Sequence, residues 1–86
     1  MQVDQKELES LIERYNSTDP AVVKENIVKY IDTSPYSNQG VANLVGVDIQ
    51  TIYSWRQIRK QTGISFENAV KLCNVLGISL VKLMEN

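Results

Sequence analysis

The sequence predicts an all-α fold, and three observations lead to that prediction. Apolar residues recur at three- and four-residue intervals through most of the 86 residues, as they do along one face of a helix. Residues that start or end helices, such as Ser, Asp-Pro, Gly and Pro, stand at the borders of these segments. No stretch of useful length alternates apolar and polar residues as a half-buried strand does. We therefore expect short helices that stabilise one another by packing.

The first expected helix covers residues 4–15. Asp4 can cap its start, Glu7 stands at the third helical position of a capping box, and four apolar residues share one face. These residues are Leu8, Leu11, Ile12 and Tyr15. They can form a dimer or partner surface, or they can fold back on the core.

The second expected helix begins at Asp19-Pro20, a cap residue followed by proline at the first helical position. It should run to about Ile31, because Pro35 disfavours helix in the residue before it. This start also suggests two parts: residues 1–18 as an N-terminal helical extension, and residues 19–86 as the compact domain.

The next two helices are short. Ser37 or Asn38 can cap the first of them, and Gly46 should stop it, since glycine is common just past a helix end. The other should run from Ile49 to about Arg59 with Asp48 as its cap; its apolar side holds Ile52, Trp55 and Ile58.

Two more helices complete the expected fold. Ser65 can cap a helix over 66–76 that Gly77 ends, and Ser79 can start a last short helix over 80–84. Cys73 lies on the apolar face of 66–76, where packing is a better explanation than a redox role.

The composition argues against several classes of function. The chain has no histidine and one cysteine, so the common zinc, haem and iron–sulfur ligand sets and the Ser-His-Asp and Cys-His arrangements are missing. Neither a disulfide framework nor a signal peptide nor a membrane span is recognisable. We therefore expect no metal, no cofactor, no membrane partner and no enzyme activity, and a cytoplasmic location.

The net charge of −1 is unevenly distributed along the chain. Residues 1–35 hold seven acidic and four basic residues, a net charge of −3, whereas residues 36–86 hold three acidic and five basic residues, a net charge of +2. Between Asp48 and Glu67 every charged residue is basic: Arg56, Arg59 and Lys60. Such asymmetry is one cue for nucleic-acid contact, although these bases can also form an ordinary solvated helix face.

The most informative stretch is NQGVANLVGVDIQTIYSWRQ, residues 38–57. Ala42 is small where two helices would cross, Gly46 allows a sharp turn, and Ile52 and Trp55 can fill the angle between the helices. Together with ISFENAVKLCNVLGISLVKLM, residues 64–84, this stretch resembles the helix-turn-helix proteins of the phage repressor and Cro type. The resemblance covers about 19–86.

The resemblance implies a compact five-helix repressor-like helix-turn-helix domain, here with an additional N-terminal helix, that binds double-stranded DNA and acts as a transcriptional regulator. The second helix of the unit would lie in the major groove, and pairing of two domains as a homodimer would supply enough specificity. By position, the implied base contacts are Ile49, Gln50, Tyr53, Ser54 and Gln57. The implied phosphate contacts are Ser37, Asn38, Gln39, Arg56, Arg59, Lys60 and Ser65.

Two positions depart from the family pattern. Asp48 stands where the family often has Ser or Thr, and its negative charge is unhelpful near phosphate. Arg56 replaces an acidic residue that usually follows the Trp position, which favours DNA. A helix-turn-helix domain used for protein binding is the alternative, which Asp48, Ile49 and the net charge favour and the basic residues at 56–60 oppose. Tyr53 can contact the groove or shield Ile49, and Trp55 is expected in the core rather than stacked on bases.

Overall fold

The computed structural model describes residues 4–60 and 62–85 of the chain. Within these residues the protein is all-α, with six helices and no strand. The helices are α1 (Gln5–Ser17), α2 (Pro20–Asp32), α3 (Asn38–Val45), α4 (Ile49–Arg56), α5 (Phe66–Leu76) and α6 (Val81–Met84). Their order and spacing confirm the all-α prediction.

Side-chain oxygens cap the first five helices at the expected residues. Asp4, Asp19 and Asp48 each accept a hydrogen bond from the backbone N–H two residues later, and Ser37 and Ser65 from the N–H three residues later. These bonds satisfy amides that have no partner inside the helix. The last helix differs from the expectation that Ser79 starts a helix over 80–84, because α6 begins at Val81 and has no side-chain cap.

Glycines end α3 and α5, as expected. Gly46 and Gly77 have φ of +88° and +69°, in the left-handed region that glycine enters without a Cβ penalty. Apart from the adjoining residues, no heavy atom lies within 4 Å of a Cβ built on either glycine, so it is the backbone conformation and not crowding that favours glycine there.

The end of α4 differs from the expectation. The helix ends at Arg56 rather than near Arg59, and Gln57 leaves it with an extended ψ of 92°. The carbonyl groups at this end bond to Lys24 of α2, thirty residues or more away in sequence. The spacing of apolar residues within 49–59 carries no information about such a distant partner, so it could not predict where the helix ends.

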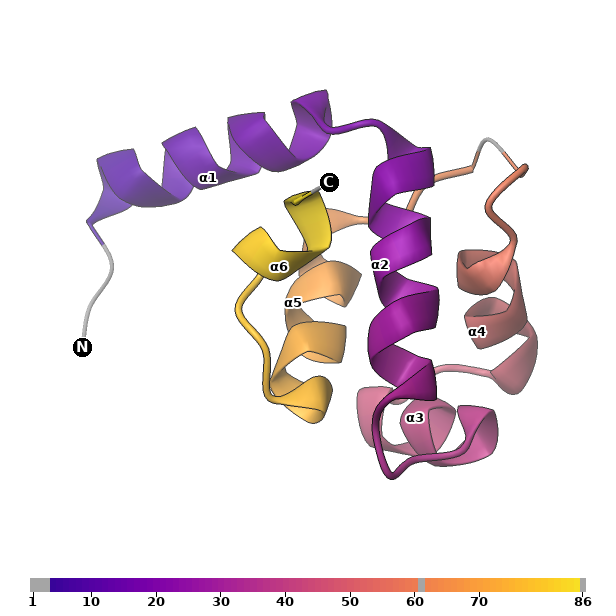
Figure 1. Cartoon of the computed structure of the whole chain (residues 1–86). Coiled ribbons are helices and arrows are strands. Elements are labelled where there is room, and N and C mark those ends of the chain that lie inside the picture. The colour runs from indigo at the N-terminus through magenta and orange to yellow at the C-terminus, as the bar shows by residue number, and fades with distance from the viewer. Residues whose placement is uncertain (1–3, 61, 86) are drawn as a thin grey trace.

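The core is built around α2, which runs through the middle of the molecule in Figure 1 with α6 on one side and α4 on the other. α3 packs against both α4 and α5. Apolar residues from all six helices enter this core, although the start of α1 is exposed. The side chains of Ile27, Val41, Ile52, Leu72 and Leu83 are completely buried. Trp55 is also buried, as expected.

The C-terminal end of α1 belongs to this core, which corrects one prediction. Tyr15 is buried, and its hydroxyl donates a 2.6 Å hydrogen bond to the carbonyl oxygen of Ile64. Its ring meets that of Phe66 edge to face, with the centroids 5.7 Å apart. Tyr15 is therefore a core residue and not part of a partner surface. Burial raises the pKa of its phenol, so the hydroxyl stays protonated and able to donate.

The rest of α1 extends beyond the body of the molecule (Figure 1). Leu8 is exposed, whereas Leu11 and Ile12 are half-buried and Leu11 packs against the core. Thus the apolar face is covered at one end of the helix and open at the other. In the described residues, no helix combines the length and apolar character that crossing a bilayer requires.

Candidate nucleic-acid interface

The connection between α3 and α4 is a tight turn with a fixed geometry. The N–H groups of Gly46 and Val47 both donate to the carbonyl oxygen of Ala42, at 2.9 and 3.0 Å. Ala42 and Ile52 are completely buried where the two helices pack together. Hydrogen bonding and packing therefore set the angle between α3 and α4 together.

The outward side of α4 carries a polar stripe. Gln50 and Tyr53 are exposed and Ser54 is half-buried, at the i, i+3 and i+4 spacing that places side chains on one helix face. The exposed Gln57 follows directly after the last residue of α4. The structure thus brings four of the five expected base-contacting residues together. Ile49 is different, because it is half-buried and packs against the core. Only part of its side chain is open to a ligand.

The polar side chains at the N-terminus of α3 differ in the hydrogen bonds that they already make within the protein. Ser37 uses its hydroxyl oxygen as an acceptor for the Gly40 N–H at 3.0 Å, which leaves the hydroxyl proton for another partner. The exposed Gln39 amide donates to the Asn43 side-chain oxygen at 2.9 Å, and Asn38 is half-buried. At α5, Ser65 accepts from the Asn68 N–H in the same manner as Ser37.

The three basic residues at the end of α4 and just beyond it are not equivalent. Arg56 Nη2 lies 2.8 Å from Asp32 Oδ1, with 22% of the arginine side chain exposed and 55% of the aspartate. The charge of Arg56 is therefore partly neutralised before any ligand binds. Its contact with phosphate stays a prediction, and a phosphate group would have to compete with Asp32 for the guanidinium. Arg59 and Lys60 are exposed, and neither takes part in an ion pair within 4–60 and 62–85.

Lys24 is the residue that sequence reasoning missed. It is only 1% exposed, and its ammonium donates to the carbonyl oxygens of Ser54, Gln57 and Lys60 at 3.3, 3.2 and 3.0 Å. Burial, helped by the charge of Lys60, lowers the pKa of Lys24. A sequence signal was present, because Lys24 falls on the same face of α2 as Ile27 and Ile31.

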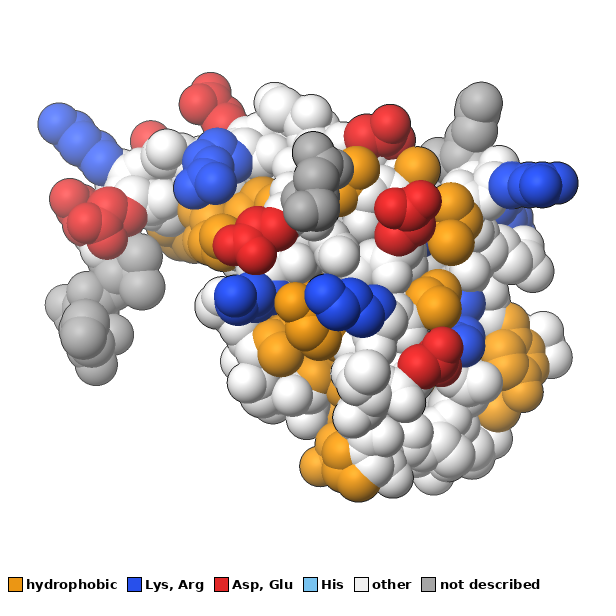
Figure 2. All heavy atoms as spheres, in the orientation of Figure 1, with side chains coloured by type: hydrophobic (Ala, Val, Ile, Leu, Met, Phe, Trp, Pro, Cys, Tyr) orange, Lys and Arg blue, Asp and Glu red, His pale blue; other side chains and the backbone are white. Residues whose placement is uncertain are grey.

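Charges of both signs are interspersed over the face seen in Figure 2, without a large patch of one sign. Beside the two exposed bases lies an open groove of about 440 Å³, lined by Asp19, Pro20 and Ala21 at the start of α2 and by Ile58, Arg59 and Lys60. At this end of α4, attraction for phosphate can come from Arg59, Lys60 and Arg56, and Arg56 is already paired with the Asp32 carboxylate.

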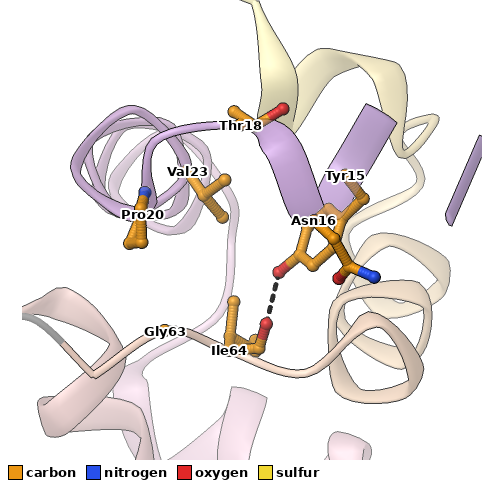
Figure 3. Close-up of a pocket in the computed structure, with 7 residues that line it drawn as sticks. All are labelled: Tyr15, Asn16, Thr18, Pro20, Val23, Gly63 and Ile64. Carbon is orange, nitrogen blue, oxygen red and sulfur yellow. Dashed lines mark hydrogen bonds between the residues drawn. The ribbon is translucent and has the colours of Figure 1, made fainter. Parts of the chain in front are cut away.

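A second hollow lies where α1 meets α2 (Figure 3). It holds about 170 Å³ and is lined by Tyr15, Asn16, Thr18, Pro20, Val23, Gly63 and Ile64. Its one phenol is already bonded to Ile64, as the dashed line shows. None of the other lining side chains is ionisable, so the hollow has no acid–base pair for chemistry. Among the described residues no group of three or more potential metal ligands occurs.

Comparisons with protein-family models, with curated proteins and with solved structures found no match to this chain.

Proposed function

We propose that this protein is a sequence-specific double-stranded DNA-binding transcriptional regulator, of phage or bacterial repressor type. One observation supports this most directly: α3, the left-handed turn at Gly46 and α4 form a compact unit whose second helix buries Ile52 and Trp55 and exposes a polar stripe. A helix held in this way can enter a major groove while the first helix crosses the backbone.

In this proposal the stripe of α4 reads base edges. The amide of Gln50 can make the paired acceptor and donor contact that adenine requires, and the hydroxyl of Ser54 can donate to or accept from any base. Tyr53 and Gln57 extend the stripe by one turn. Ile49 offers only apolar contact to a thymine methyl group, through the part of its side chain that the core leaves open.

Arg59 and Lys60 supply most of the attraction for phosphate in this proposal, because Arg56 is paired with Asp32. The N-termini of α3 and α5 supply amide and hydroxyl donors through Ser37 and Ser65, joined by Asn38 and Gln39. With so few cations the affinity of one domain is modest, and two domains on adjacent half-sites supply the rest.

The decisive experiment measures binding to random duplex DNA as a function of salt. The association constant should fall steeply as salt rises, because bound cations on DNA are released. Gln50→Ala should change sequence preference in a selection from random DNA, whereas Arg59→Ala should weaken all sequences alike. Absence of binding at low salt refutes the proposal, and equal, sequence-independent losses in both variants refute the assigned roles.

The proposed homodimer places the open end of α1 at the contact. Leu8 is exposed and Ile12 half-exposed on that face, while Tyr15 is excluded because it is in the core. Leu8→Glu should lower the mass measured by light scattering without unfolding the chain. Removing residues 1–17 is a poorer test because it also removes the hydrogen bond from Tyr15.

A protein-binding role is the second candidate, and one observation favours it. Leu44 is 57% exposed, and Tyr53 and Ile58 are also exposed apolar residues near this unit. Together with the carboxylate of Asp48 they suit a partner protein better than phosphate. If this role is correct, Leu44→Lys abolishes partner binding while the chain binds no duplex at low salt; under the DNA proposal, the same variant retains or increases duplex affinity.

A further inference from the structure

The segment that follows α4 winds around a single buried ammonium group. The Gln57 N–H donates to the Ser54 carbonyl oxygen, and the Lys60 N–H donates to the Gln57 carbonyl oxygen, at 3.2 and 3.1 Å. These two successive turns place the carbonyl groups of residues 54, 57 and 60 around the Lys24 Nζ atom, which donates to all three. A lysine ammonium has three donors, so its hydrogen-bonding capacity is filled.

The burial of this ammonium group needs an explanation, since moving a charged group out of water costs free energy unless all its donors are hydrogen-bonded. That cost is offset at the C-terminal end of α4, where the ammonium group meets the negative end of the helix dipole and three carbonyl oxygens. Because the side chain is 1% exposed, Lys24 cannot itself reach a ligand. Its effect on any ligand has to be transmitted through residues 54–60.

We propose that Lys24 is a positioning residue for the DNA-contacting end of α4: it stops the helix at Arg56 and fixes the course of residues 57–60, from which Arg59 and Lys60 project. This inference rests on the proposed function. It explains why two exposed cations can serve as phosphate contacts from a segment outside any helix. A turn that is already ordered avoids the entropy cost of ordering those side-chain positions on binding.

The test compares the salt dependence of duplex binding in matched variants. Lys24→Met removes the donors and keeps a chain of similar length; Lys29→Met is the control, because it removes an equal charge from an exposed position on the same helix. Each phosphate contact contributes about 0.9 to the slope of log K against log salt. Lys24→Met should reduce the slope by up to about 1.8, and Lys29→Met should leave it nearly unchanged.

A double-variant background identifies the route of the effect. When Arg59→Ala and Lys60→Ala are already present, adding Lys24→Met should not reduce the slope further. If wild-type protein binds duplex but Lys24→Met matches Lys29→Met in slope and affinity, the inference is overturned and the proposed function stands. If wild-type protein binds no duplex at low salt, both are overturned.

A measurement on the unaltered chain covers the case in which Lys24→Met does not fold. Amide hydrogen exchange of free wild-type protein should show Gln57 and Lys60 protected, because each donates to a carbonyl that Lys24 also holds. Exchange of the Lys60 amide at the rate of an unstructured chain would show that the segment is not ordered before binding, and would overturn the inference.

Discussion

Replacing Tyr15 by phenylalanine removes one buried hydrogen bond and little else. The ring and its edge-to-face contact with Phe66 remain, while the 2.6 Å hydrogen bond to the Ile64 carbonyl oxygen is lost. Within the described residues that oxygen has no other donor. A buried acceptor left without a partner costs about 1–3 kcal/mol, so we expect Tyr15→Phe to lower the free energy of unfolding by about 1.5 kcal/mol.

Urea titration followed by the fluorescence of Trp55 measures this change, because Trp55 is the single tryptophan and is buried. For a domain of this size, about 1.5 kcal/mol corresponds to a Tm lower by roughly 6–12 °C. Tyr36→Phe is the matched control, since Tyr36 is exposed and should change the stability by less than about 0.5 kcal/mol. If Tyr15→Phe behaves like Tyr36→Phe, the C-terminal end of α1 is not anchored as described.

Three further perturbations test other parts of the structure. Burial raises the pKa of the Cys73 thiol from 9.0 to about 11. The contribution of the protonated thiol to the free energy of unfolding is therefore fully present below pH 9 and is lost as pH rises toward 11, by up to about 2–3 kcal/mol. When unfolding is measured at several pH values, Cys73→Ala should show a smaller loss of stability over this interval than the wild-type protein. Asp32→Asn should increase duplex affinity at low salt by freeing Arg56, with less than about 1 kcal/mol change in stability, and an unchanged affinity would show that the pair does not restrain Arg56. Gly46→Ala should lower the free energy of unfolding by about 1–2 kcal/mol, because Gly46 has a positive φ. Gly63→Ala is the control in the same urea titration, since Gly63 has no positive φ. Equal losses of stability in the two variants would contradict the role of the turn.

The starts of the helices were predictable because their causes are local. Asp19-Pro20 and Ser65 hold their own cap groups within three residues of the amides that they bond. The polar stripe of α4 was predictable for the same reason, since helical periodicity alone places Gln50, Tyr53 and Ser54 on one face.

Features that depend on distant residues were not predictable. The end of α4 is determined by Lys24, and the charge of Arg56 is offset by Asp32, 24 residues earlier. Likewise, an apolar stripe on α1 does not reveal which of its residues the core covers, and only the structure shows that Tyr15 reaches Ile64. Each of these contacts joins segments that no local pattern relates.

The central helix also bears on the order in which the protein can form. Besides Lys24, α2 carries Asn26, whose side-chain amide donates to the carbonyl oxygens of Leu83 and Glu85, at sequence separations of 57 and 59. During synthesis α2 emerges early, yet the Asn26 amide has no native acceptor until residues 83–85 have left the ribosome. Until then one side of α2 stays open to water and to other chains. Completion of the native state must therefore await the C-terminal helix, and a nascent chain that pauses before α6 should be the species most exposed to proteolysis and aggregation.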